Sequence, residues 1–438
     1  MINQRSHHRT IGTVAVFLLM TGGASAALAN FVPWGMALGL GLLSGAAGAA
    51  GTYAWELRAL EKARLHAWRE ATAPGPSGEP GWESGPAGDS VLAMLNPERR
   101  VVTFNRLRTP ERESLRAFFD SGDRADRRRE EWTLGDRVRL LRGGAGLGKT
   151  RLLVEATSEL SYESAPYCGW IAPGKENEAL RAAVGWDRPA VLIIDDAETR
   201  PDLAEMLKSL ARKPNADVRV VLAARDFGPW WARVLGTLDP RTTVGLLGSA
   251  HIEVGPLVTT PHDLQQLFTQ AVRDYAKCFG TSPPEATLAT ANAATPLVLV
   301  HAAAAMAAHQ GLSGPVDIDT AVAGLFDIEE EWWERLAREQ DLEVGRAKLR
   351  AAVVASVLVG AADQAAAERL MRHLPGLDQA RPDIVSELAL LVRAFYPQRI
   401  GDWLDPHLPG RLVERYVADQ LAAAPALQAA LVAAALTE

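Results

Sequence analysis

One eight-residue loop constrains this 438-residue chain more than any other feature. The run GGAGLGKT, Gly143–Thr150, follows the apolar segment Val138–Leu141 and precedes a helical pattern. It matches the Walker A pattern, in which glycines let backbone N–H groups turn toward phosphates and the next helix adds its positive dipole end. Lys149 is expected to reach the β- and γ-phosphates, and Thr150 to ligate Mg²⁺. The predicted nucleotide-binding residues of the loop are Gly143, Gly144, Ala145, Gly146, Leu147, Gly148, Lys149 and Thr150.

A second apolar strand ends in two acids. Val191–Ile194 is apolar throughout, as a central strand of a parallel sheet is, and Asp195 and Asp196 follow it directly. Asp195 is the expected second metal ligand beside the threonine of the loop. Either Asp196 or Glu198 is expected to orient the attacking water, and the residues alone do not decide between them. The alternative is a pair of solvated acids that cap the next helix.

A third strand places an arginine at the same sheet edge. Val218–Ala224 ends at Arg225, and ligands bind beyond the carboxyl ends of parallel strands. Arg225 is therefore expected to contact the γ-phosphate, with a surface pair to Asp226 as the alternative. The sequence has neither an Asn-Lys-x-Asp tetrad for guanine nor a Leu-Ser-Gly-Gly-Gln signature. The expected ligands are ATP or ADP with Mg²⁺.

The pattern along the chain predicts two kinds of architecture. From Arg137 to Leu257 short apolar runs alternate with helical patterns, which predicts an α/β P-loop NTPase domain, a parallel sheet with flanking helices. After Pro261 the sequence is alanine-rich, which predicts an all-α region. Two tryptophan pairs, Trp230-Trp231 and Trp332-Trp333, are each expected to open a helix. The expected C-terminal helices are Leu264–Tyr275, Ala286–His309, Lys348–Val359, Ala365–Leu374 and Leu412–Ala423.

The N-terminal part has no charged residue from Thr10 to Trp55. That length predicts a transmembrane hairpin of two helices within residues 11–55, with the turn at Asn30–Pro33. Positive charges flank both outer ends and the turn has none, which predicts a two-pass protein of the cell (inner) membrane with a cytoplasmic NTPase domain. A cleaved signal peptide that ends near Ala26 is the alternative.

These patterns divide the chain into five expected parts. They are a hairpin at 1–55, a juxtamembrane helix and Pro/Gly linker at 56–89, the NTPase domain at 90–257, a helical lid at 258–340 and a winged-helix-like region at 341–438. The formal net charge of −7 argues against nucleic acid as a partner, since such domains are basic. The two cysteines, Cys168 and Cys278, form no metal-binding pattern.

Four segments together resemble the STAND class of signalling ATPases, the relatives of NACHT and NB-ARC proteins. They are GGAGLGKT, VLIIDDAETRPD from Val191, VRVVLAARDFGPWW from Val218 and ATPLVLVHAAAAMA from Ala294. Pro296 matches the proline of the family's Gly-x-Pro motif, which packs near the adenine, although Ala294 replaces the glycine. The segment Asp402–Leu421 is similar to the end of the family's winged helix.

The resemblance implies a switch in a bacterial membrane-anchored member. The ADP form is closed, the ATP form opens and forms a homo-oligomer, slow hydrolysis resets the state, and a protein partner, unknown here, supplies or receives the signal. Two alternatives stay open from the residues. One is an ATPase that works continuously on a membrane-associated substrate, and the other is a binding scaffold that the nucleotide stabilises.

Overall fold

The computed structural model describes most of the chain after residue 61. The described residues are 62–74, 90–120, 133–158, 160, 167–184, 189–214, 216–248, 251–290, 292, 295–396, 398, 403–406 and 408–436. The predicted hairpin at 11–55 lies outside them. Within them, no single helix is both long and apolar enough to cross a bilayer; only the pair α17 (Gly410–Ala423) and α18 (Pro425–Ala435) has the length and composition, and it is bent by 113°.

The chain divides after Glu70 into two compact units. In the first unit, residues 62–70 are helical, as expected for the segment after the hairpin. The second unit holds a six-stranded sheet and a helical region. The strands are β1 (Thr72–Pro74), β2 (Val138–Arg142), β3 (Tyr167–Ile171), β4 (Ala190–Ile194), β5 (Val218–Ala224) and β6 (His251–Glu253).

The sheet has the order β1-β3-β4-β5-β2-β6. Strands β2 to β6 are parallel, which confirms the predicted parallel sheet. The difference is β1, which pairs antiparallel with β3 and takes Ala73 and Pro74 out of the expected linker. A proline is tolerated there because β1 is an edge strand. β5 lies between β2 and β4, so the end of β5 is next to both the glycine loop and the acids after β4.

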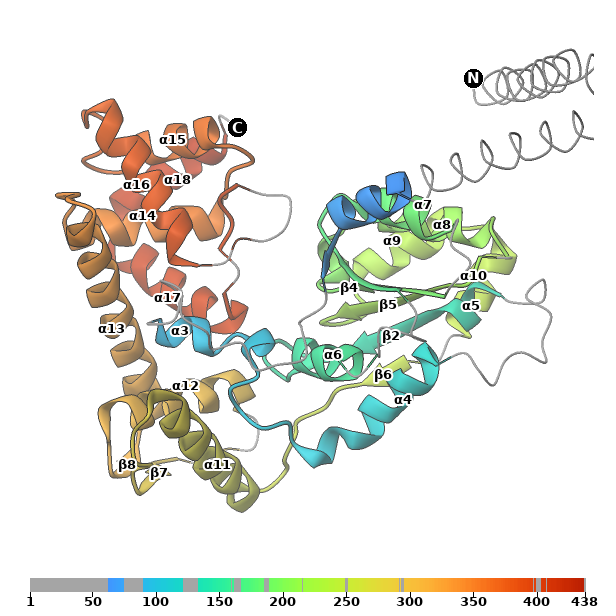
Figure 1. Cartoon of the computed structure of the whole chain (residues 1–438), viewed down its shortest axis with the longest axis horizontal. Helices are drawn as coiled ribbons and strands as arrows, with labels where there is room; N and C mark the ends of the chain where they lie inside the picture. The colour runs from blue at the N-terminus through green and yellow to red at the C-terminus, as the bar shows by residue number, and fades with distance from the viewer. Residues whose placement is uncertain are drawn as a thin grey trace, which may run out of the picture. The chain divides into compact units, whose positions relative to one another are not determined.

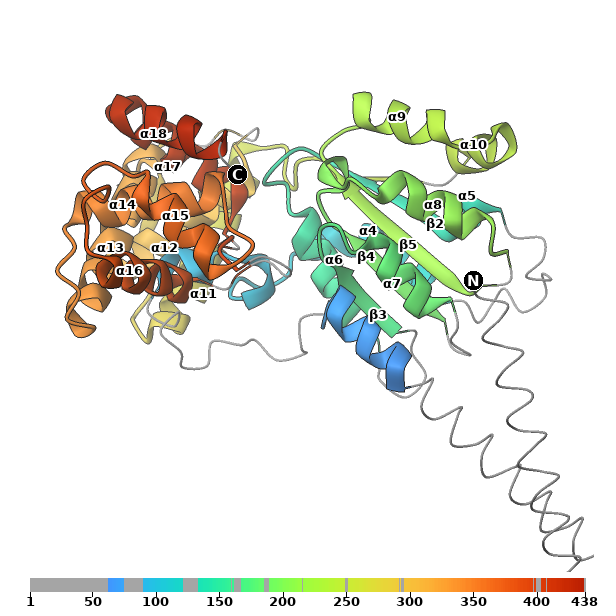
Figure 2. The same ribbon diagram turned by 90° about the horizontal axis from the view of Figure 1, so that it is seen from above.

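Helices cover both faces of this sheet (Figure 1, Figure 2). On one face α4 (Thr109–Phe119) and α6 (Lys149–Ser158) pack through Phe118, Phe119 and Leu152 onto alternate side chains of the strands. On the other face lie α7 (Glu176–Ala183), α8 (Leu203–Ala211) and α9 (Pro229–Thr237). Every residue of β4 and β5 is buried, which explains why β4 is apolar throughout and β5 is apolar except at Arg219, whose Nη1 donates to Phe119 O at 2.8 Å. The short helices α5 (Leu134–Arg137) and α10 (Pro240–Leu247) complete this part.

The C-terminal region is helical, as predicted, and has its own apolar core. Its helices are α3 (Val91–Met94), α11 (Pro261–Phe279), α12 (Leu297–Gln310), α13 (Ile318–Glu339), α14 (Arg346–Leu358), α15 (Gln364–Arg372), α16 (Pro382–Phe395), α17 and α18. The described residues after 340 add two isolated β-bridges, Ala361 with Leu404 and Gln398 with Pro406. A winged helix there stays a prediction.

Two expectations for this region were wrong. The expected helix Ala286–His309 is instead a short strand, β7 (Ala286–Leu288), followed by α12. β7 pairs in parallel with β8 (Gly314–Val316), which comes after α12. The region is therefore not purely α-helical, and α12 begins only after Pro296, which caps it. The pair Trp230-Trp231 does open α9, but Trp332-Trp333 lies in the second half of α13 and is buried there.

Two adjacent buried carboxylates on α13, Glu329 and Glu330, join this helix to other segments of the helical region. Glu329 accepts hydrogen bonds from Ser90 Oγ at 3.0 Å, from Leu92 N at 2.6 Å and from Tyr396 OH at 2.8 Å. It thus fixes the N-terminal end of α3. Burial raises the pKa of Glu329 to about 7, although these donors oppose the shift.

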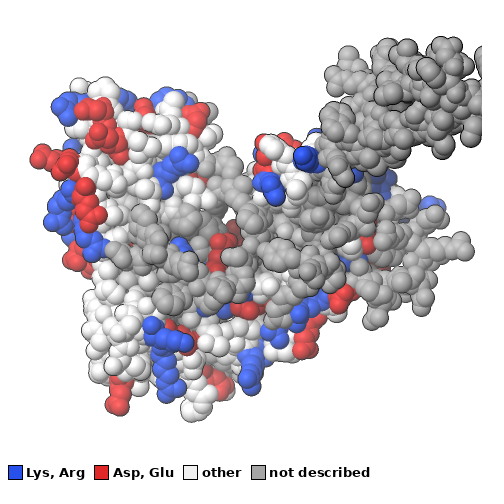
Figure 3. All heavy atoms as spheres, viewed as in Figure 1, with Lys and Arg blue, Asp and Glu red and all other residues white. Residues whose placement is uncertain are grey.

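The next residue on α13, Glu330, fixes α17 instead. Its two oxygens accept from the guanidinium of Arg350 at 2.8 and 2.5 Å, and Oε1 also accepts from Tyr416 OH at 2.9 Å. The ring of Tyr416 stacks on Phe326 with 4.3 Å between centroids. On the face drawn in Figure 3, by contrast, the described charged side chains of both signs are interspersed, which is typical of a solvated surface.

Candidate nucleotide-binding site

The loop after β2 has the backbone that a phosphate-binding loop needs. Gly146 and Gly148 have φ of 76° and 91°, in the left-handed region that glycine adopts without strain. At Gly143, a Cβ would lie 2.5 Å from the carbonyl oxygen of Val254, so the loop passes too close to β6 for a side chain. These three glycines are therefore required by geometry.

Lys149 begins α6 and turns back over the loop. Its Nζ donates to the carbonyl oxygens of Gly143 at 2.7 Å and Gly144 at 3.2 Å. The residue is 8% exposed. Burial lowers the pKa of Lys149, and the carboxylates of Asp195 and Asp196 partly offset this. Burying an ammonium group costs free energy, and hydrogen bonds to neutral carbonyls offset it less than a bond to an anion such as phosphate does.

Thr150 and Asp195 meet as the sequence predicts for a metal site. Thr150 Oγ1 donates to Asp195 Oδ2 at 2.7 Å, across 45 positions of sequence. Burial and the neighbouring Asp196 raise the pKa of Asp195, while the bond from Thr150 and the charge of Lys149 lower it. Mg²⁺ prefers a few oxygen ligands together with phosphates, so this hydroxyl and carboxylate fit it. Thr150 and Asp195 would hold the ion, which would neutralise phosphate charge.

Asp196 and Glu198, the two candidates for orienting the water, have different surroundings. Asp196 has a φ of 50°, which is uncommon for a residue other than glycine, and its N–H donates to Asp195 Oδ1 at 3.0 Å. Asp196 lines the cavity next to the loop. Glu198, in the turn η6 (Ala197–Thr199), accepts from the backbone N–H of Arg225 at 3.1 Å and is not among the cavity-lining residues.

Arg225 lies at the end of β5, between the loop and the acids after β4. Its guanidinium donates through Nη2 to Glu414 Oε1 on α17 at 3.0 Å, and its Nε lies 3.7 Å from Glu198 Oε1. Its carboxylate partners are thus Glu198 and Glu414, in place of the surface pair with Asp226 that was the alternative. Asp226 Oδ1 accepts from Gly228 N in its own turn.

A cavity of about 960 Å³ joins these residues to the helical region. Besides Ala145 to Arg151 of the loop and α6, it is lined by Asp195, Asp196 and Arg225. Pro296 is not in the lining; it packs against the loop, where a Cβ on Gly146 would lie 3.3 Å from its Cβ. The next residue of α12, Leu297, lines the cavity instead.

Sequence reasoning missed two walls of this cavity. One is the segment before the sheet, residues 95–105, and the other is the start of α17 with Arg411 and Glu414. Neither segment carries a pattern of its own, because its role depends on being brought to the loop by the fold. The contact of Arg225 with Glu414 spans 189 positions.

Comparisons with known proteins give structural neighbours only. No protein-family model matches the chain, and no curated protein matches it. Solved structures do show similarity, and two of them serve as examples. One is the Walker-type ATPase PABY2304 of Pyrococcus abyssi, with a TM-score of 0.28, 11% identity, and coverage of 68% of this chain and 96% of that one. The other is PCH-2 of C. elegans, with a TM-score of 0.27, 13% identity, and coverage of 55% and 71%.

The assignment of the fold therefore depends on the chain's own geometry. The glycine loop follows β2 and precedes α6, and its threonine is hydrogen-bonded to the acid that follows β4. Parallel strands carry both segments to the same sheet edge, where ligands of such sheets bind. These features together are those of a P-loop NTPase fold with a helical C-terminal region.

Proposed function

We propose that this chain is an ATP-binding signalling switch of the STAND type, anchored in the membrane by residues 11–55, which hydrolyses ATP slowly. In the ADP form the helical region stays packed on the sheet. In the ATP form it opens and assembles with further copies of the chain. One contact carries the proposal, the ion pair between Arg225 and Glu414, because it joins the phosphate edge to the C-terminal helices.

A γ-phosphate would compete for this arginine. Arg225 ends the strand between the loop and the metal-binding acid, so a γ-phosphate on the loop is a second anionic partner for its guanidinium. Phosphate oxygens form strong charge-assisted bonds with arginine. ADP lacks this group. A ligand shifts a two-state equilibrium only through such differential contacts, so the ion pair supports a response to ATP that ADP does not give.

The strength of the pair limits how much it contributes. Its side chains are 51% and 42% exposed. Exposed pairs contribute about 0.2–1 kcal/mol, which changes a population ratio by about fivefold at most. A shift from mostly closed to mostly open needs about 5.5 kcal/mol. Further contacts must change, and the helical region lies close enough to the loop to make them, because a Cβ built on Gly146 would lie 3.0 Å from Val298 and 3.9 Å from Arg411.

Hydrolysis is assigned to the acids after β4. Asp195 with Thr150 holds the metal ion, and Asp196 orients the attacking water. The position of Asp196 on the cavity wall supports this choice, whereas Glu198 is engaged with the backbone of Arg225. The left-handed backbone of Asp196 fits a residue whose position matters for the site, since such strain concentrates at functional positions.

The switch is tested by comparing ADP with a non-hydrolysable ATP analogue. Sedimentation should show larger assemblies with the analogue. Proteinase K should cut faster within residues 255–286, first at residues 255–260, which join β6 to α11 of the helical region. The variant Lys149→Ala should respond to neither ligand. Equal sedimentation and equal cleavage with both ligands would leave a static nucleotide-binding domain.

The ion pair is tested by Glu414→Gln, which removes the partner of Arg225 but leaves the phosphate site intact. It should shift the ADP form toward the protease-sensitive state by up to about fivefold. The matched control is Asp319→Asn, which removes a carboxylate paired with Arg415, the next residue of α17. If both variants behave alike, the Arg225 contact is not the one that responds to nucleotide.

The membrane hairpin would assist assembly. Confinement of the chains to one surface raises their effective concentration. The pattern of charges around residues 11–55 supports the proposed orientation with both ends in the cytoplasm, where ATP is available.

A further inference from the structure

The segment of residues 95–105, here called the strap, forms one wall of the cavity. It leaves α3, makes the single turn η2 (Pro97–Arg99), and continues extended to η3 (Arg106–Arg108). Arg100, after the turn, has a φ of 53°. No strand pairing of the strap is present among the described residues. Its position relative to the glycine loop therefore depends on side-chain contacts.

Arg151 donates two hydrogen bonds to the strap. Its Nη1 donates to the carbonyl oxygen of Pro97 and its Nη2 to that of Val102, both at 3.1 Å. One planar guanidinium thus holds both ends of the turn. Glu155 fixes the fork through Nη2 at 2.7 Å and also lies 3.7 Å from Arg100 Nε. The side chain of Arg151 is 19% exposed.

The same helical turn carries the proposed phosphate-binding residues. Arg151 directly follows Lys149 and Thr150 at the start of α6. Any displacement of the strap relative to the phosphate loop must therefore break bonds to this turn. Two further contacts hold the strap, from Arg100 Nη2 to Val154 O at 3.3 Å and from Thr103 N to Asp274 Oδ2 at 2.9 Å.

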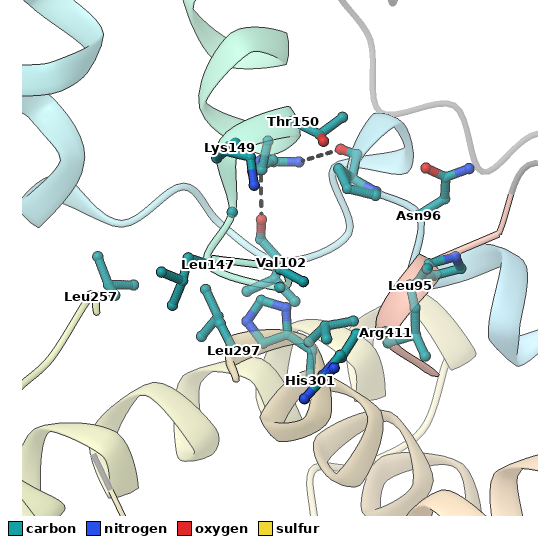
Figure 4. Close-up of a pocket in the computed structure, with 18 of the residues that line it drawn as sticks. Leu95, Asn96, Val102, Leu147, Lys149, Thr150, Leu257, Leu297, His301 and Arg411 are labelled. Atoms are coloured by element: carbon teal, nitrogen blue, oxygen red, sulfur yellow. Dashed lines mark hydrogen bonds between the residues drawn. The ribbon is translucent and has the colours of Figure 1, made fainter. Parts of the chain in front are cut away.

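The strap faces α12 across the cavity. Figure 4 shows Val102 on one side and Leu297 and His301 on the other, with Lys149 and Thr150 at the loop end of the same space. Burial, with the charge of Arg151, lowers the pKa of His301 to about 4, so its imidazole is neutral at physiological pH. With phosphates on the loop, a base would extend into this space, where apolar walls and a neutral ring suit a flat heterocycle.

We propose that Arg151 is a positioning residue that holds the strap as the wall for the nucleotide base. It thereby sets how much of the binding energy comes from the base rather than from the phosphates. The inference depends on the proposed nucleotide binding, but not on the switch. Arg151 itself does not need to touch the ligand, because its donors are already directed to the strap and to Glu155.

The test compares MgATP with magnesium tripolyphosphate, which has the phosphates but no base. Calorimetry on the full chain gives both Kd values for the wild type, Arg151→Met and Arg151→Lys. In the wild type MgATP should bind more tightly than tripolyphosphate. Arg151→Met should reduce this preference by about tenfold or more, with the tripolyphosphate Kd unchanged within about twofold. Arg151→Lys keeps the charge and one hydrogen bond, so its preference for MgATP should lie between those of the wild type and Arg151→Met.

The matched control is Arg346→Met, which removes a two-bond arginine fork to Glu334 on α13. It should leave both Kd values unchanged. A parallel loss of both ligands in Arg151→Met and Arg151→Lys, or an unchanged preference in both, would overturn the inference. A wild type that binds neither ligand would overturn the proposed function itself, which is a different result.

Discussion

At the scale of single residues, the site keeps ionisable groups in positions that cost stability. Asp195 is partly buried beside Asp196, and both effects raise its pKa, so its charged form is disfavoured without a cation. Lys149 is likewise disfavoured as a charged group by burial. Groups held in this way are relieved when a ligand of opposite charge binds, which is why strongly shifted pKa values gather at functional sites.

The variant Asp195→Asn should therefore gain stability and lose metal binding together. The amide removes the repulsion with Asp196 and still accepts a hydrogen bond from Thr150, so the melting temperature without ligand should rise. The enhancement of ATP affinity by Mg²⁺ should be lost, while affinity measured in EDTA stays within about threefold. Thermal melting and calorimetry measure the two effects. An unchanged Mg²⁺ enhancement would show that Asp195 is not a metal ligand.

At the scale of elements, α13 holds two other helices, α3 and α17, in place. Its residue Glu329 holds α3 and its residue Glu330 holds α17, through bonds that are all buried. The first of these bonds depends on pH. The pKa of Glu329 is raised to about 7 from its usual 4.5. The folded protein therefore keeps a proton that the unfolded chain releases between about pH 4.5 and pH 7.

This sign predicts a loss of stability as pH rises. The favourable contribution of protonated Glu329 is complete below pH 4.5 and is lost as pH rises through about 7. Glu329→Gln stays neutral, so its free energy of unfolding should increase relative to that of the wild type as pH rises from 5 to 8, by at most about 3 kcal/mol. Urea unfolding at both pH values measures it. Glu331→Gln, an exposed neighbour, is the control; an equal pH response in both variants would contradict the assignment.

Elements differed in how far the sequence could predict them. β4 and β5 are buried on both faces, and their apolar runs, interrupted only at Arg219, predicted them. The run from Ala286 to His309 is alanine-rich, which favours a helix, although Pro296 within the run disfavours helix at the residue before it. Its first three residues nevertheless form β7, because β8, 28 positions later, supplies a parallel partner. Pairing of this kind is decided by tertiary structure and leaves little local signal.

The same limit applied to the site. The proposed phosphate and metal residues follow strands in a known pattern, so Lys149, Thr150 and Asp195 could be proposed from their positions alone. The strap and Glu414 reach the cavity from opposite ends of the second unit, and their residue types are ordinary for a surface. Only the folded chain brings Arg151 to the strap and Arg225 to Glu414.

At the scale of the whole molecule, the buried contacts of α13 define a route between distant segments. Ser90 follows the Pro/Gly-rich stretch after the predicted membrane hairpin and is hydrogen-bonded to Glu329. The adjacent Glu330 is bonded to Tyr416, two positions after Glu414 on α17. A shift of Ser90 would therefore act on neighbouring residues of the helix that holds the partner of Arg225. Coupling through such packed, hydrogen-bonded elements is physically contiguous.

The orientation of the chain in the membrane is the prediction at this scale. The charge pattern around residues 11–55 predicts that the turn at Asn30 lies outside and that both ends lie in the cytoplasm. In a background with both native cysteines changed to alanine, an impermeant maleimide applied to intact cells should label Asn30→Cys. It should miss Gln379→Cys, an exposed position in the helical region, until the cells are opened. Labelling at position 379 from outside, or a mature chain that begins after Ala26, would favour the signal-peptide alternative.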